Sequence, residues 1–416
     1  MILSPSTYWA RWLASCLLTG SALLSAQAAD HQTGASPPRL MATEAEAELS
    51  PERLLERTKL LKTAEAALSR LDVEVANHAL ERAALIAHDG GTEIAIVRSH
   101  MQGGQYRRAL AFGAHTAGAH LDEIGGAVLY AWLLHLGGQS AVAQRLLKET
   151  EARAPNDALV KQVQKQFNNG APVASKALLA LPTRLAPYGS SHGLPVNARV
   201  VGSGLLLASG KEALVPLKLV SSASDADSFW LRNGLGQLSK AKITKRIPSA
   251  GVALMALEQT LPKAEDWWVA SKDAFPGSIG YVVEYPVTSN SAPAWPILRT
   301  GFLGGVLMSD AGKSGNFTAA GERALGIDMP AGPRGGPVFD AGGRLIGLAL
   351  KGKAGTPDRL IPASLLRREL EKLPHGKGIT VATLGALPVD GVQGRMAIDK
   401  IYEVSLKATL QVIARP

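Results

Sequence analysis

The chain has 416 residues, a formal net charge of +9 and a single cysteine. This length exceeds that of an ordinary single domain and predicts two or three domains, and the hydrophobic share of 46% is enough for a core that needs neither disulfides nor metals. The basic residues are dispersed, without a dense Lys/Arg block or interleaved aromatic residues, which argues against nucleic acid as a partner.

Residues 1–28 have the pattern of a cleavable secretory signal peptide. Arg11 gives a weakly basic start, the apolar run 13–24 is too short to span a bilayer, and Ala26-Gln27-Ala28 is a small-x-small cleavage signal. The alternative is a short buried helix. Cys16 loosely resembles a lipidation site, but most of the apolar run follows it, which favours full cleavage near Ala28. The mature chain is therefore expected to be periplasmic or secreted and to lack a transmembrane segment.

A helical domain is predicted over residues 50–169, after a leader at 29–49 that is rich in Ala, Ser, Pro and Gln and is expected to be flexible. Ser50-Pro51 is a strong helix start, because serine caps the free backbone N–H groups and proline is well suited to the first helical position. Apolar residues then recur at three- and four-residue spacing, which is typical of amphipathic helices.

A repeat lies within this helical region. Gly104-Gln105-Tyr106, followed by Ala109, returns 34 residues later as Gly138-Gln139-Ser140, followed by Ala143. Glycine suits a tight inter-helix turn and alanine suits a close helix contact. The segment 89–169 resembles the tetratricopeptide-repeat family, which implies a concave helical surface that binds a protein segment. The alternative is a plain array of helical hairpins.

The character of the sequence changes after residues 170–195, which read as a linker beginning with Asn-Gly-Ala-Pro. From 196 to 373, short runs of Val, Leu and Ile alternate with Gly, Pro, Asn and Ser. Many short strands separated by turn signals predict an all-β barrel or sandwich.

Five motifs in this β region occur in a characteristic order and spacing. They are Gly202-Ser203-Gly204, the run Leu214 to Val220, Ile247 to Met255, Gly326 to Asp340 with its Gly332-Pro333-Arg334-Gly335-Gly336-Pro337 core, and Leu360-Ile361-Pro362-Ala363. Together they resemble the trypsin-like serine peptidases of the Deg or high-temperature-requirement type. The resemblance implies a double β-barrel over 196–373.

The same resemblance identifies three departures from a working active site. Lys218 stands where the family has its general-base histidine, Gly251 where it has the orienting aspartate, and Arg334 where it has the nucleophilic serine. A serine-type triad needs a hydroxyl, an imidazole and a carboxylate, and none of these roles is filled. The chain is therefore expected to be a catalytically inactive protein rather than an enzyme.

The residues that stand at these positions suggest an anion-binding pocket. Lys218, Arg334 and the loop amides at Gly332 are expected to surround it, with Asp328 nearby, and a peptide carboxylate is the natural ligand. The alternative is that Arg334 pairs internally with an acid such as Asp328 or Asp340. No metal site and no cofactor are expected.

The positions of the histidines leave one way in which the chain could still be a serine protease. Six of the nine lie between His78 and His135, and only His192 and His375 flank the β region, so a relocated triad would have to recruit His192. The tail 374–416 ends in a predicted helix and strand. That strand either completes the barrel, is the stub of a further domain, or docks without a special role.

Three functions remain open from the sequence. The first is an exported, inactive protein that binds proteins or peptides through the helical groove and the old protease cleft. The second is an active serine endopeptidase with relocated residues. The third is a scaffold or assembly factor of an envelope or secretion complex.

Overall fold

The computed structural model describes residues 49–169, 176–224, 227–262, 268–307, 321–329, 333–352, 354–373, 384 and 394–415. The predicted signal peptide at 1–28 and nearly all of the leader lie outside the described residues. The chain divides into a unit ending at Glu56 and a unit beginning at Arg57. In the described part of the chain, no helix has the length and apolar character needed to cross a membrane.

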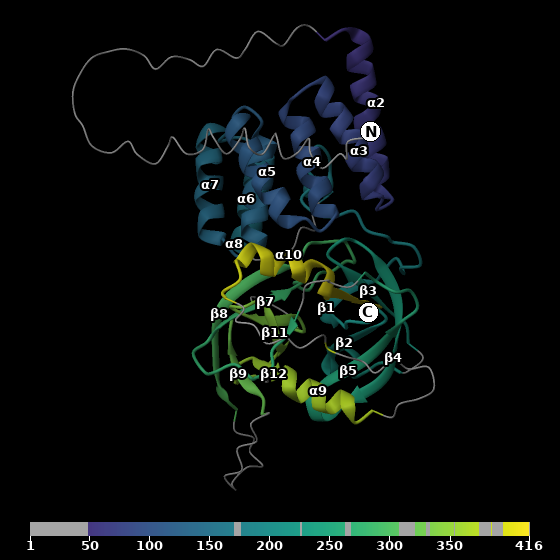
Figure 1. Cartoon of the computed structure of the whole chain (residues 1–416), viewed down its shortest axis with the longest axis vertical. Coiled ribbons are helices and arrows are strands. Elements are labelled where there is room, and N and C mark those ends of the chain that lie inside the picture. Colours follow the sequence, from purple (N-terminus) through teal and green to yellow (C-terminus); the bar gives the residue numbers. More distant parts are fainter. Residues whose placement is uncertain are drawn as a thin grey trace, which may run out of the picture. The chain divides into compact units, whose positions relative to one another are not determined.

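The helical region forms a series of hairpins (Figure 1). Its helices are α2 (Pro51–Ser69), α3 (Val73–Ile86), α4 (Gly90–Gln102), α5 (Tyr106–Ala119), α6 (Ile124–Leu136), α7 (Ser140–Arg153) and α8 (Ala158–Asn169). Helices α4, α6 and α8 begin at residues 90, 124 and 158, and α5 and α7 begin at 106 and 140. The 34-residue spacing seen in the sequence is thus also the spacing of the helix starts.

The two turn glycines of the repeat have the same conformation. Gly104 has φ 74° and Gly138 has φ 85°, the left-handed region that glycine adopts without steric cost. The residue after each glycine closes the turn with a backbone hydrogen bond to the preceding helix: Gln105 N to His100 O at 2.8 Å, and Gln139 N to Leu134 O at 2.9 Å.

The first barrel contains the last strand of the chain. Its strands are, in spatial order, β1 (Arg199–Leu206), β13 (Thr409–Ala414), β3 (Phe229–Asn233), β4 (Leu238–Ile247), β5 (Val252–Leu257) and β2 (Glu212–Pro216), with β2 closing back onto β1. Strand β13 pairs antiparallel with both β1 and β3, and α10 (Ile398–Ala408) leads directly into it. The C-terminal segment therefore forms one wall of this barrel.

The second barrel is built from residues between the two halves of the first. Its strands are, in spatial order, β10 (Pro337–Asp340), β7 (Ile279–Glu284), β8 (Ile297–Val306), β9 (Arg323–Gly326), β12 (Arg359–Pro362) and β11 (Arg344–Leu350), closed by β10–β11 pairing. The short β6 (Trp268–Val269) adds to β11 in parallel, and α9 (Ala363–Glu371) follows β12. The predicted fold class, helices followed by a trypsin-like double β-barrel, is confirmed.

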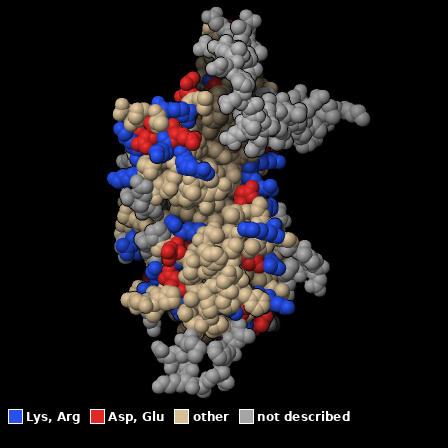
Figure 2. Space-filling view, turned by 90° about the vertical axis from the view of Figure 1, so that its left-hand side faces the viewer, with Lys and Arg blue, Asp and Glu red and all other residues tan. Residues whose placement is uncertain are grey.

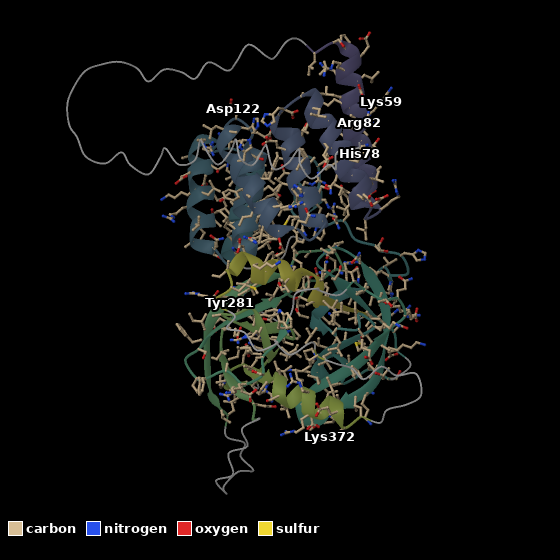
Figure 3. All side chains as sticks on the ribbon, in the orientation of Figure 1. Lys59, His78, Arg82, Asp122, Tyr281 and Lys372 are labelled. Carbon is tan, nitrogen blue, oxygen red and sulfur yellow. The ribbon has the colours of Figure 1, made fainter. Side chains whose placement is uncertain are left out.

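The helices and the barrels share one hydrophobic core. Buried residues from α4, α6 and α7, from both barrels and from α10 belong to a single cluster that includes Met101, Trp132, Leu147, Leu205, Leu298 and Tyr402. The Tyr106 and Tyr402 rings meet edge to face at 4.5 Å, and Arg107 Nε lies 3.2 Å from Asp399 Oδ2. Figure 3 shows side chains between the helices, α10 and the strands of both barrels.

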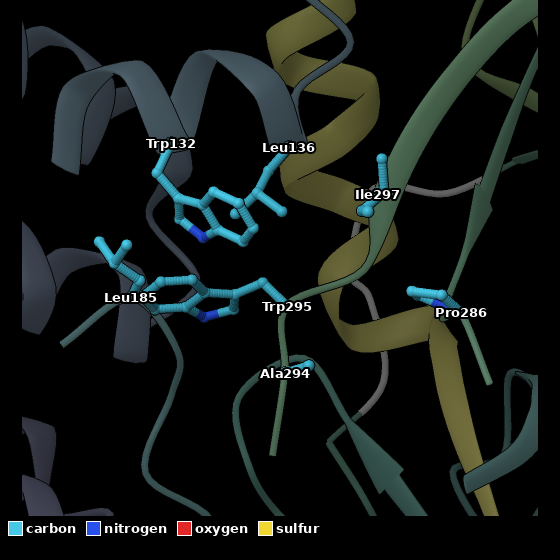
Figure 4. Close-up of a pocket in the computed structure, with 7 residues that line it drawn as sticks. All are labelled: Trp132, Leu136, Leu185, Pro286, Ala294, Trp295 and Ile297. Carbon is cyan, nitrogen blue, oxygen red and sulfur yellow. The ribbon is translucent and has the colours of Figure 1, made fainter. Parts of the chain in front are cut away.

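The segment between the helices and the first barrel covers α4 and α6. This segment follows the short helix η2 (Lys176–Leu179), and Arg98 of α4 donates to Pro182 O at 3.3 Å. Gln102 accepts from Tyr188 N at 2.8 Å. In Figure 4, Leu185 lies with Trp132 and Leu136 of α6 around a small apolar cavity that Trp295 closes from the barrel side. This face of the hairpins is occupied by the chain itself, which was not anticipated from the repeat.

The turn at Gly138 gives a stability prediction. A Cβ on this residue would lie 2.7 Å from Cδ2 of Leu298, a buried residue of β8, and the positive φ would add strain. We expect Gly138→Ala to destabilise the protein by about 2 kcal/mol, measured by chemical denaturation. Gly277→Ala is the matched control, because Gly277 has φ 83° but open space around its Cβ position. Equal losses in both variants would contradict the contact with Leu298.

Candidate functional site

Lys218 and Gly251, which the sequence predicts at the positions of the base and the orienting acid, follow neighbouring strands or precede them in the first barrel. Lys218 is in the short helix η3 (Leu217–Val220) that follows β2, and Gly251 ends η4 (Pro248–Ala250) just before β5. Pro216 of β2 pairs with Val252 of β5, and Leu217 N donates to Gly251 O at 2.9 Å. The fold thus brings these two positions together, as the trypsin-like arrangement requires.

The loop that carries the missing nucleophile packs directly against the first barrel. Arg334 and Gly335 precede β10, and a Cβ on Gly335 would lie 2.6 Å from the ring of Pro216. A Cβ on Gly202 would meet the side chain of Leu219 at 2.7 Å and Arg334 O at 3.5 Å. Arg334 and Gly335 therefore lie next to β1 and the end of β2, where the two barrels meet.

The guanidinium of Arg334 is completely buried and fully engaged. Nε and Nη2 donate to Glu284 at 2.8–3.3 Å, Nη1 donates to Asp358 Oδ2 at 2.8 Å, and Nη1 also donates to Ile327 O at 2.5 Å. The side chain has 0% exposure. All of these partners belong to the second barrel or its connections, so the side chain points into that barrel.

Glu284 organises the loop as well as the arginine. It is the last residue of β7 and is 1% exposed. Besides binding Arg334, its Oε1 accepts from Gly335 N at 3.2 Å and Gly336 N at 3.3 Å. Two backbone amides of the former catalytic loop are therefore directed at a carboxylate of the protein itself.

Asp358 supplies the second negative charge. Gly352 N donates to its Oδ1 at 3.0 Å, and Lys351 Nζ lies 3.2 Å from the same oxygen. Burial alone would raise the pKa of Asp358, but the hydrogen bond from Gly352 and the interactions with Arg334 and Lys351 hold it below its ordinary value. Burial alone would lower the pKa of Arg334, yet the attraction of Glu284 and Asp358 raises it overall. Asp358 and Arg334 therefore both stay charged at neutral pH.

The other predicted site residues do not join this cluster. Lys218 and Asp328 are exposed, and Gly332 lies outside the described residues. Asp340 instead holds the β10–β11 turn, accepting from Gly342 N and Arg344 N at 2.9 Å. The alternative that Arg334 pairs internally with an acid agrees with these contacts, but the acids are Glu284 and Asp358 and not the two named examples, Asp328 and Asp340. The guanidinium, with its described partners, is not free to serve an anion pocket.

Glu284 was not predicted as a site residue, although the sequence contains a signal for it. It is the only charged residue in the buried run Ile279 to Tyr285, and a charge in such a run is rarely buried without a partner. Its partner lies 50 residues further along the chain. No local pattern connects the two.

The described residues offer no relocated triad. The sequence contains no histidine between His192 and His375; His192 is exposed, and His375 lies outside the described residues. Ser203, the buried serine of β1, is held by Tyr285, whose N donates to Ser203 Oγ at 2.7 Å. Among the described side chains of the barrels, a hydroxyl and an imidazole are not brought together.

No family model and no curated protein matches this sequence. Similar solved structures include the inactive form of the Rv3671c protease of M. tuberculosis, at 16% identity and TM-score 0.32, covering 42% of this chain and 89% of that one. The MamO protease domain from Magnetospirillum magneticum has 18% identity and TM-score 0.30, covering 45% and 100%. The HtrA-type protease AlgW with decapeptide has 15% identity and TM-score 0.30, covering 41% and 50%. These neighbours are trypsin-like proteases, and likeness at this level concerns the fold alone.

The buried ion pair predicts a large effect of one substitution. Glu284→Gln leaves the Arg334 charge buried with only Asp358 opposite it, and we expect a loss of about 3–5 kcal/mol in unfolding free energy. Glu258→Gln is the matched control: Glu258 lies 3.8 Å from Lys240 on the surface, and its loss should cost less than about 0.5 kcal/mol. Denaturation midpoints that fall equally in both variants would show that Glu284 does not hold the arginine.

Proposed function

We propose that this protein is an exported, catalytically inactive trypsin-like module that acts by binding other proteins. The observation that carries the proposal is the buried Arg334, which stands at the nucleophile position and is tied to Glu284 and Asp358. A guanidinium is neither a nucleophile nor a base, because it does not lose its proton in proteins. Export rests on the signal-like pattern of residues 1–28.

The tetratricopeptide-like part of the proposal is supported by the 34-residue spacing of the helix starts. The binding surface that we propose is a hollow lined by residues of α5, α6 and α7 and of the turn after α5. Leu121, which is 58% exposed, is one of its lining residues. The other lining residues are Ala114, Ala117, Gly118, Tyr130, Leu146, Glu149, Ala152 and Arg153.

The described surface carries charges of both signs. This distribution fits contact with another protein better than long-range attraction through charge of a single sign. On the face in Figure 2, basic and acidic side chains are interspersed, and a broad area carries neither. A scaffold role in an envelope complex is the second candidate, favoured by the core that joins the helices and both barrels into one body. An endopeptidase with relocated residues has no such support among the described residues.

The loss of catalysis gives a direct prediction. The mature chain should neither cleave casein nor react with a fluorophosphonate probe of activated serines. Arg334→Ser should also remain unlabelled, because the chain has Lys218 and not an imidazole at the predicted position of the general base, so nothing takes the proton of the hydroxyl. Both assays are scored against trypsin under the same conditions. Probe labelling of the unmodified chain, with casein cleavage that the probe abolishes, would overturn the proposal.

The binding surface is tested by a second experiment. Affinity capture from an envelope extract should recover partners with the intact chain, and Leu121→Asp should recover several-fold less, because it places a charge at the rim of the hollow. Leu85→Asp is the matched control, since Leu85 is 72% exposed on α3, away from the hollow. Equal recovery by both variants would remove the hollow from the proposal.

A further inference from the structure

Three histidines converge on one buried carboxylate in the helical region. His88 Nε2 lies 2.5 Å from Glu93 Oε1, His115 Nε2 lies 3.4 Å from the same oxygen, and His120 Nε2 lies 3.4 Å from Glu93 Oε2. The His88 and His120 rings are 5.4 Å apart between centroids, and those of His88 and His115 are 6.1 Å apart. The sequence suggested no metal, and its cluster of histidines was used only as evidence against a relocated triad.

The burial of the Glu93 carboxylate suggests that it binds a positively charged ligand. Its side chain is 2% exposed, and none of the hydrogen bonds of the described residues reaches either carboxylate oxygen or Nε2 of His120. A buried carboxylate without hydrogen bonds is costly and normally has a compensating charge. A bound cation supplies such a charge, and the imidazole nitrogens around Glu93 are donors that it can share with the carboxylate.

The geometry points to a zinc-type site. We propose that His88, Glu93 and His120 bind one divalent transition-metal ion, with zinc as the representative ion. The ligand atoms of His88, Glu93 and His120 all lie within 4.8 Å of one another. In a tetrahedral zinc site with metal–ligand bonds of about 2.0–2.1 Å, neighbouring ligand atoms are about 3.3 Å apart. Imidazole and carboxylate are the donors that such ions accept.

The local structure holds these donors in place. Asp89 caps α4, its Oδ1 accepting from Thr92 N at 3.1 Å, which fixes the helical turn that carries Glu93. A Cβ on Gly90 would lie 2.8 Å from Cγ of Glu123 and 3.4 Å from Cβ of His120, so the start of α4 and the end of α5 approach closely only because residue 90 is glycine. A bound ion would join the α3–α4 loop, which carries His88, to the end of α5.

This site is independent of the proposed function and is tested with the tag-free mature chain. After removal of metal with a chelator, zinc is titrated by calorimetry and metal content is measured by mass spectrometry. We expect one zinc per chain and a rise in melting temperature on binding. Glu93→Gln and His88→Ala should each weaken zinc binding at least about tenfold and remove the rise.

The controls separate this site from adventitious binding by surface histidines. His78 and His192 are exposed and lie outside the cluster, so His78→Ala and His192→Ala should bind zinc as the unmodified chain does. Circular dichroism in the absence of metal checks that each variant is folded, and His88, being exposed, is the substitution least able to disturb folding. Zinc binding that is unchanged in Glu93→Gln and His88→Ala, or absent from the unmodified chain, would overturn the site.

Discussion

The buried charge of Arg334 is the constraint around which the double barrel is arranged. Because a guanidinium stays protonated, it is tolerated in the interior only with anions and hydrogen-bond acceptors on every side. Glu284, at the end of β7, and Asp358, just before β12, bind different nitrogens of the guanidinium, and Ile327 adds a carbonyl. Glu284 also receives the amides of Gly335 and Gly336. The loop that precedes β10 is therefore fixed by a structural ion pair.

This arrangement agrees with a protein that acts through its surfaces. The helical hairpins pack against the barrels, since Tyr106 and Tyr402 meet within one continuous core. Strand β13 brings the end of the chain into the first barrel. The chain also covers its own α4 and α6. Among the described residues of the helical region, a hollow lined by α5, α6 and α7 is open to a partner.

The sequence predicted what local patterns encode. The Gly104 and Gly138 turns and the 34-residue spacing of the helix starts follow from short-range signals, and so does the order of the barrel motifs. The partners of Arg334 did not follow, because Glu284 lies 50 residues away and only the closed barrel brings it near. The histidine cluster was missed for a similar reason: His88, Glu93 and His120 come from two loops and a helix start that only packing brings together.

The central claim is that the Arg334 side chain is locked inside the second barrel. Nitrogen-detected NMR of ¹⁵N-arginine-labelled protein measures it directly, through the rate at which each Nε–H exchanges with water. The account predicts an Arg334 Nε–H that exchanges at least about 100-fold more slowly than that of Arg344, whose side chain is 36% exposed, because exchange requires local opening of the barrel. Exchange of Arg334 as fast as that of Arg344 would contradict the account.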